Sequence, residues 1–153
     1  MSTVYNTLMA DMKEAMKSRD AVKTAVLRSL KTALTEKEIA ARTDGSRTEL
    51  TDEAVIQVLM KSAKQRKDSI TQFENAGRTD LADIEKAELA VIESYLPKMM
   101  SEDEIRAIAT EVIAAVGAKG PADMGKVMGG LMPRVKGKAD GGLVNAVVKS
   151  LLG

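Results

Sequence analysis

Apolar residues recur every three or four positions along almost the whole chain, and no segment alternates steadily between apolar and polar residues. This spacing matches the 3.6-residue turn of an amphipathic helix, whereas a half-buried strand would alternate. The pattern therefore predicts an all-α protein. In the N-terminal part it predicts a first helix carrying the stripe from Tyr5 to Met16, followed by helices over about 21–42, 51–75 and 80–95.

Leu96 and Pro97 interrupt this helical pattern. Proline disfavours a helical conformation in the residue before it, so a helix should end here. We therefore expect a helical N-terminal domain over residues 1–97. A compact three-helix C-terminal domain is expected over residues 98–153.

Polar residues mark where the three C-terminal helices should begin. Ser101 and Glu104 form a capping-box pattern, in which each side chain bonds to the backbone of the other. Asp123 and Asp140 are expected to cap the second and third helices through their side chains. The second helix is expected to end before Pro133, because proline has no backbone N–H to donate.

The chain of 153 residues contains no cysteine and no histidine. These residues supply thiol and imidazole groups, which bind most zinc ions and carry much acid–base chemistry. The sequence therefore predicts no catalytic residue, no metal site and no cofactor. An aromatic content of 2% also argues against single-strand binding by base stacking.

The N-terminal segment is charged and amphipathic. It lacks the apolar core and the small-residue cleavage site of a secretory signal peptide. No stretch approaches the roughly 18 apolar residues of a membrane-spanning helix. We therefore expect a soluble, cytoplasmic protein with no membrane partner.

Positive charge is concentrated in one window of a nearly neutral chain, residues 119–138. Five basic residues lie there against one acidic residue, Asp123, a net charge of +4. Such a patch favours phosphate-rich partners such as RNA. The five basic residues are Lys119, Lys126, Arg134, Lys136 and Lys138.

Gly129 and Gly130 lie within the second predicted C-terminal helix, on the side that also carries Lys126. Glycine inside a helix costs roughly 1 kcal/mol relative to alanine, so two in succession require a reason. One reason is close approach of a sugar–phosphate backbone to Lys126. The other is a tight crossing by a neighbouring helix, and the sequence leaves both open.

Residues 133–142 form a basic, glycine-rich hinge that leads directly into a helix N-terminus. Cations and the positive end of a helix attract phosphate, although Asp140 would occupy some of the free amides as the cap. A solvated surface loop is the alternative interpretation. The GxxxxGK match ending at Lys126 is a chance match, because Val127 replaces the hydroxyl that would hold magnesium in a nucleotide-binding loop.

Arg66 projects onto the apolar stripe of the third helix, where a lone charge would be costly. We expect it to meet Glu85 or Glu88 of the following helix. The interpretation is a structural ion pair that locks a helical hairpin, without a role in function.

Methionines repeat at helical spacing in two places. They either belong to the core or form adaptable faces that dock a partner helix. The two groups are Met9, Met12 and Met16, and Met124, Met128 and Met132.

Several segments together resemble the GatB/YqeY family, over nearly the whole chain. They are the run from Arg66 to Phe73, residues 76–78 and 80–88, the Tyr95-Leu96-Pro97 break and residues 124–129. The chain is similar to a free-standing YqeY-like protein. Its tail is similar to that of the B subunit of glutamine-dependent tRNA amidotransferase, which implies a tail that grips tRNA outside the catalytic centre.

Carried onto this sequence, the resemblance implies an RNA-contacting surface in the C-terminal domain, with Ala139 and Val144 as packing positions. The sequence departs from the amidotransferase tail at residues 140–142, where that tail more often has an Asn-Pro pair. The candidate RNA-binding residues, including two added from the charge and glycine pattern, are Gly125, Lys126, Gly129, Gly130, Arg134, Lys136, Gly137, Lys138 and Asn145.

We therefore expect a protein that is not an enzyme by itself and that binds tRNA or a tRNA-handling complex, with no DNA partner. One alternative is a helical adaptor that binds another protein. The other is an accessory component of the amidotransferase, a carbon–nitrogen ligase with glutamine as amido-N-donor.

Overall fold

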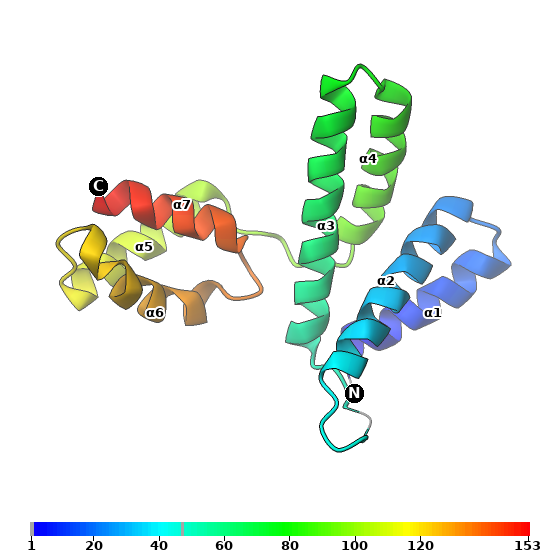
Figure 1. Cartoon of the computed structure of the whole chain (residues 1–153), viewed down its shortest axis with the longest axis horizontal. Coiled ribbons are helices and arrows are strands. Elements are labelled where there is room, and N and C mark those ends of the chain that lie inside the picture. Colours follow the sequence, from blue (N-terminus) through cyan, green and yellow to red (C-terminus); the bar gives the residue numbers. More distant parts are fainter. Residues whose placement is uncertain (1, 47) are drawn as a thin grey trace. The chain divides into compact units, whose positions relative to one another are not determined.

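The computed structural model describes residues 2–46 and 48–153, and over these residues the chain is all-α without a strand, as predicted (Figure 1). The described residues form two compact units, one up to Leu96 and the other from Pro97 to Gly153. The division follows the Leu96-Pro97 break in the sequence. That residues 1–97 and 98–153 behave as independent domains stays a prediction.

The described part of the first unit is built from two helical hairpins, α1 with α2 and α3 with α4 (Figure 1). Leucine and isoleucine side chains from all four helices fill its core, so the hairpins share one apolar interior. The helices are α1 (Thr3–Lys17), α2 (Ala21–Ala40), α3 (Asp52–Asn75) and α4 (Thr79–Glu93). The core includes Leu8, Leu27, Leu30, Leu34, Leu59 and Ile92.

Two polar contacts tie α1 to distant parts of the first unit. The Asp52 carboxylate accepts hydrogen bonds from the Ser2 hydroxyl and from the Val4 N–H, the latter at 3.1 Å. The Ser2 bond, helped by the Val4 bond, holds the pKa of Asp52 below its usual value. Near the middle of α1, Asp11 accepts a hydrogen bond from the Tyr95 hydroxyl at 2.6 Å. Burial together with this bond raises the pKa of Tyr95 well above its usual value.

Three helices of the described chain end in the same way, with one residue in the left-handed conformation. The residues are Arg19 (φ 59°), Gly77 (φ 70°) and Gly117 (φ 67°). In each case the next residue donates its N–H back across the last turn, as in a Schellman motif. Glycine adopts this conformation without steric cost, whereas an arginine does not. The turn after α1 is therefore the strained member of the three.

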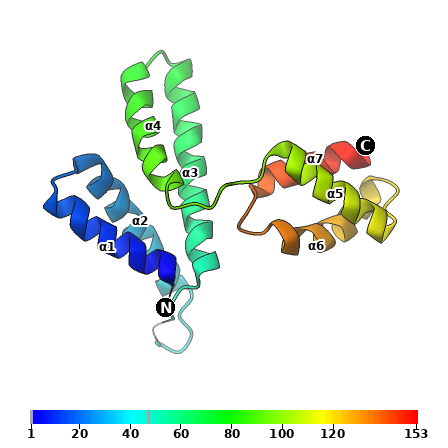
Figure 2. The same cartoon turned by 180° about the vertical axis from the view of Figure 1, so that it is seen from behind.

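The second unit packs α5 (Glu102–Val116), α6 (Met124–Val135) and α7 (Gly141–Leu152) around one core (Figure 2). A short 3₁₀ turn, Pro121–Asp123, precedes α6. The predicted capping box of Ser101 and Glu104 is confirmed, and Asp140 caps α7 by accepting from the Leu143 N–H at 3.3 Å. The core includes Ile105, Ala109, Val127, Leu131, Val144 and Val148.

Two local predictions in this unit are wrong. Asp123 does not cap α6 through its side chain, because its carboxylate accepts from the Lys119 N–H at 2.9 Å and closes the preceding turn instead. The helix also continues through Pro133 to Val135. Pro133 removes only the donor to the carbonyl of Gly129, while burial of Leu131 and Val135 holds the last turn against the core.

Candidate functional site

The helix α6 positions the central candidate residues by its amphipathic pattern. Val127 and Leu131 are fully buried against the core of the second unit. Gly125, Lys126 and Gly129 are exposed. Burial of the apolar stripe thus turns a cation and two residues without side chains toward solvent.

The two adjacent glycines have different environments. A Cβ atom on Gly130 would lie 3.0 Å from the Cγ1 atom of Val112, so α5 crosses closely at this point. At Gly129 a Cβ atom would meet nothing within 4 Å, and the same holds at Gly125. Tight helix crossing therefore accounts for Gly130, whereas Gly129 and Gly125 have open space in front of them.

Pro133 gives the Gly129 position a second property. Because proline has no N–H, the carbonyl of Gly129 lacks the donor that normally lies four residues further along a helix. Gly129 is also exposed. A ribose 2′-hydroxyl, which can donate a hydrogen bond, is a group that such a carbonyl can accept from.

Lys126 and Arg134 lie close to carboxylates. Lys126 Nζ lies 3.9 Å from an oxygen of Asp123, and an Arg134 guanidinium nitrogen lies 3.0 Å from an oxygen of Glu111 on α5. The Lys126 side chain remains largely solvent-exposed in its pair, and about half of the Arg134 side chain is exposed. Exposed pairs contribute little to stability, so both cations can exchange their partners for a phosphate.

The Lys136-Gly137-Lys138 segment is an ordered turn. Gly137 takes the left-handed conformation with φ 74°. The N–H groups of Lys138 and Ala139 both donate to the carbonyl of Val135, at 2.9 and 3.0 Å. The carbonyl of Lys138 accepts from the Met100 N–H at 2.8 Å, and Ala139 is buried. The backbone between the two lysines is thus held in place while their side chains point to solvent.

The start of α7 supplies the remaining candidate, Asn145. It is exposed, whereas Val144 beside it is buried in the core. Because Asp140 accepts from the backbone at the helix start, a carboxylate rather than an open amide faces solvent there. The candidate surface therefore relies on side-chain cations, and the N-terminus of α7 is already occupied.

Arg66 lies between the two carboxylates expected for it, across the α3–α4 hairpin. Its guanidinium contacts Glu88 closely and an oxygen of Glu85 at 3.2 Å. All three side chains are about four fifths buried. The cluster lies in the first unit, whereas the basic window belongs to the second.

Most of the methionines singled out in the sequence lie against a core, and one lies at the surface. Met9, Met12, Met124, Met128 and Met132 pack against the two cores, which favours the structural interpretation for them. The side chain of Met16 is 47% exposed.

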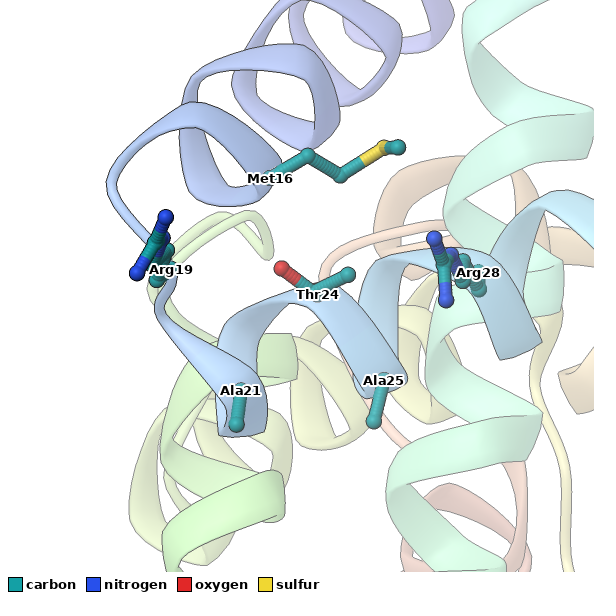
Figure 3. A pocket seen from close by; sticks show the side chains of 6 residues that line it. All are labelled: Met16, Arg19, Ala21, Thr24, Ala25 and Arg28. Atoms are coloured by element: carbon teal, nitrogen blue, oxygen red, sulfur yellow. The ribbon is translucent and has the colours of Figure 1, made fainter.

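Met16 lines a groove on the first unit that sequence reasoning missed (Figure 3). It consists of two adjoining hollows, shallow and open to solvent, of about 400 and about 580 Å³ along α1 and α2, which share Met16 and Arg28. We call it the α1–α2 groove. Because its walls come from two helices, no single sequence stripe marks it. Its lining also includes Met12, Arg19, Thr24, Lys31 and Glu36.

No group of three or more acidic side chains able to hold a metal ion occurs within residues 2–46 and 48–153. In the same stretch of chain, none of the helices combines the length and the apolar character needed to span a bilayer.

Comparison with known proteins identifies relatives over nearly the whole length. Residues 5–152 match the family model described as Yqey-like protein. A Candida glabrata protein named Altered inheritance of mitochondria protein 41, mitochondrial, is 34% identical over 118 residues, covering 73% of this chain and 63% of the relative. The protein of that name from Pyrenophora tritici-repentis is 28% identical over 99% of this chain and 82% of its own. The protein of that name from Meyerozyma guilliermondii is 32% identical, over 81% of this chain and 64% of its own.

These relatives bear on coverage and on the expected location. The chain spans slightly less than two thirds of the Candida and Meyerozyma proteins that it matches. The expectation of a cytoplasmic protein is contradicted, because all three relatives are named as mitochondrial proteins. The reasoning failed because lack of a secretory signal excludes only the secretory route and leaves other compartments open.

Proposed function

Because this chain belongs to the Yqey-like protein family, we propose that it binds tRNA, or a complex that handles tRNA, through the basic surface of its second unit. The observation that carries the proposal is the combination of Lys126 beside open backbone at Gly125 and Gly129 with the held Lys136-Gly137-Lys138 turn. Exposed lysines supply phosphate contacts. An exposed glycine lets a sugar–phosphate backbone approach closely.

Electrostatics supports the same surface. The net charge of +4 in residues 119–138 belongs to a chain whose overall net charge is +1. A local excess of this kind attracts a polyanion without making the whole protein basic. Arg134 contributes less than Lys126 does, because Glu111 lies 3.0 Å from Arg134 whereas Asp123 lies 3.9 Å from Lys126.

The proposal gives this chain a binding role and leaves carbon–nitrogen ligase chemistry to other proteins. A sequence without histidine or cysteine offers few groups for such a reaction. The similarity of its C-terminal part to the amidotransferase tail supports a role in holding tRNA. An amidotransferase complex enters this proposal only as one complex that could supply the bound tRNA.

The test is the salt dependence of tRNA affinity for the parent protein and a Lys126→Ala/Lys136→Ala/Lys138→Ala variant. Each lost phosphate contact should flatten the slope of log affinity against log salt by roughly 0.7 to 0.9. A matched control, Lys37→Ala/Lys61→Ala/Lys64→Ala, removes the same charge from exposed lysines of the first unit. It should leave the slope close to that of the parent. Equal slopes for the parent and the first variant would contradict the proposal.

Gly129→Ala tests close approach separately from charge. The added methyl group enters open space, so the fold should tolerate it. We expect weaker tRNA binding with an unchanged salt slope, because no cation is lost. Unchanged affinity would show that RNA does not approach this backbone.

A further inference from the structure

Apolar and basic side chains together line the α1–α2 groove of the first unit. Met12 and Met16 on α1 face Thr24 and Thr32 on α2 across it. Figure 3 shows Met16 reaching over α2 above Thr24, with Arg19 at the turn between the two helices. Methionine is flexible and polarizable, so a surface lined by it adapts to apolar side chains of different shapes.

Three cations line the groove, and their side chains have no ion pair with a carboxylate in the described parts of the chain. Arg19 lies at one end, and Arg28 and Lys31 follow along α2. One carboxylate, Glu36, lies at the other end. The groove thus offers an excess of positive charge over most of its length.

The backbone of Arg19 points to the same end of the groove. This residue takes a left-handed conformation, φ 59°, at the helix end where α3 and α5 have Gly77 and Gly117. A glycine at this position would remove the strain. The chain instead holds an arginine side chain at the mouth of the groove, which favours a use for that side chain in binding.

We propose that the α1–α2 groove binds an acidic amphipathic helix of a partner protein. The apolar side of such a helix would lie on Met12 and Met16, and its carboxylates would pair with Arg19, Arg28 and Lys31. From Ala21 to Glu36 the groove follows about four turns of α2, about 22 Å, which accommodates a helix of about 15 residues. Charge complementarity selects an acidic partner.

Other occupants fit the groove less well. A nucleic acid would satisfy the cations but would leave the methionines without an apolar partner, and no aromatic side chain lines the groove for base stacking. A second copy of this chain would have to present an acidic apolar helix of its own. Both occupants are outcomes of the test.

The probe is a display library of helical peptides of about 16 residues, selected against the full chain. Leucine is fixed at helical spacing, and the flanking positions vary among Glu, Lys, Gln and Ala. We expect enrichment of peptides with net negative charge. The affinity of an enriched peptide should fall about tenfold or more in an Arg28→Glu/Lys31→Glu variant, because attraction becomes repulsion.

Matched variants separate binding from folding. Lys37→Glu/Lys64→Glu makes the same charge change at exposed sites outside the groove and should alter affinity less than about twofold. Arg19→Gly relieves the strained turn, so it should be at least as thermally stable as the parent while binding the peptide several-fold more weakly. Circular dichroism checks that each variant is folded.

Four outcomes would overturn the proposal. They are enrichment of neutral or basic peptides, no enrichment at all, equal peptide affinity in Arg28→Glu/Lys31→Glu and the parent, and unchanged affinity in Arg19→Gly. Two further results would also overturn it and would identify another occupant. If the Arg28→Glu/Lys31→Glu variant converts a dimer to a monomer, the occupant is a second copy. If it loses tRNA affinity with no effect on peptides, the groove is a nucleic-acid surface.

Discussion

Arg66 shows how a single buried cation can hold two helices together. It lies between Glu85 and Glu88, and without it these two carboxylates would face each other with little solvent to screen them. Removing one member of a largely buried ion cluster is far more costly than removing an exposed pair. Lys67, on the same helix, provides the exposed counterpart, with its Nζ 3.6 Å from Glu93.

Arg66→Met keeps the apolar stem and removes the charge. We expect the free energy of unfolding to fall by about 2 kcal/mol, because Glu85 and Glu88 lose their cation. Lys67→Met, which breaks the exposed pair, should change it by less than about 0.5 kcal/mol. Urea unfolding followed by circular dichroism measures both. Equal losses in the two variants would show that burial adds nothing at Arg66.

At the scale of elements, the helices could be predicted because the apolar stripe of each helix and its capping residues indicate the same bounds. Ser101 with Glu104 is a local signal, and the structure has the capping box there. Pro133 misled the prediction because the local rule omits the burial that retains the last turn of α6. The α1–α2 groove could not be predicted, since its walls come from two helices whose contact no local pattern specifies.

The paired glycines of α6 provide a test of helix packing. Gly129→Ala should raise the free energy of unfolding by about 0.5 to 1 kcal/mol, because alanine is the better helix former and its Cβ meets open space. Gly130→Ala gains the same propensity but presses on Val112, a buried, β-branched side chain that cannot easily rotate away. It should therefore be less stable than Gly129→Ala by about 1 kcal/mol. Thermal unfolding of the two variants decides this, and an equal gain would show that α5 yields readily.

On the scale of the whole molecule, the two proposed surfaces belong to different units. The RNA-binding proposal concerns the unit from Pro97 to Gly153, and the groove belongs to the unit up to Leu96. With both surfaces in use, the chain would join an RNA to an acidic protein partner. Each surface can be altered separately, so the variants above test them independently.

Acid should weaken the first unit in a way that tyrosine fluorescence can follow, because both tyrosines, Tyr5 and Tyr95, lie in it. The pKa of Asp52 is held below its usual value by Ser2 and Val4. The stability that ionised Asp52 contributes is therefore fully present above its unfolded pKa of about 4. This stability is lost as the pH falls through the lower pKa of the folded state. Asp52→Asn should lower the urea midpoint at pH 6, and its difference from the parent should shrink toward pH 2. A constant difference across this range would refute the role of Asp52.

The bond from Tyr95 to Asp11 also limits how early the first unit can fold during synthesis on the ribosome. It joins positions 84 residues apart, and α1 also packs against α3. At about 5 to 20 residues per second, Asp11 is made roughly 4 to 17 s before Tyr95. The α1–α2 hairpin is complete once Ala40 is made, about 3 to 11 s before Tyr95. Until α3 and α4 follow, Leu8 and Leu27 stay incompletely covered. The newly made hairpin therefore exposes apolar surface that the complete first unit buries, and such surface favours aggregation.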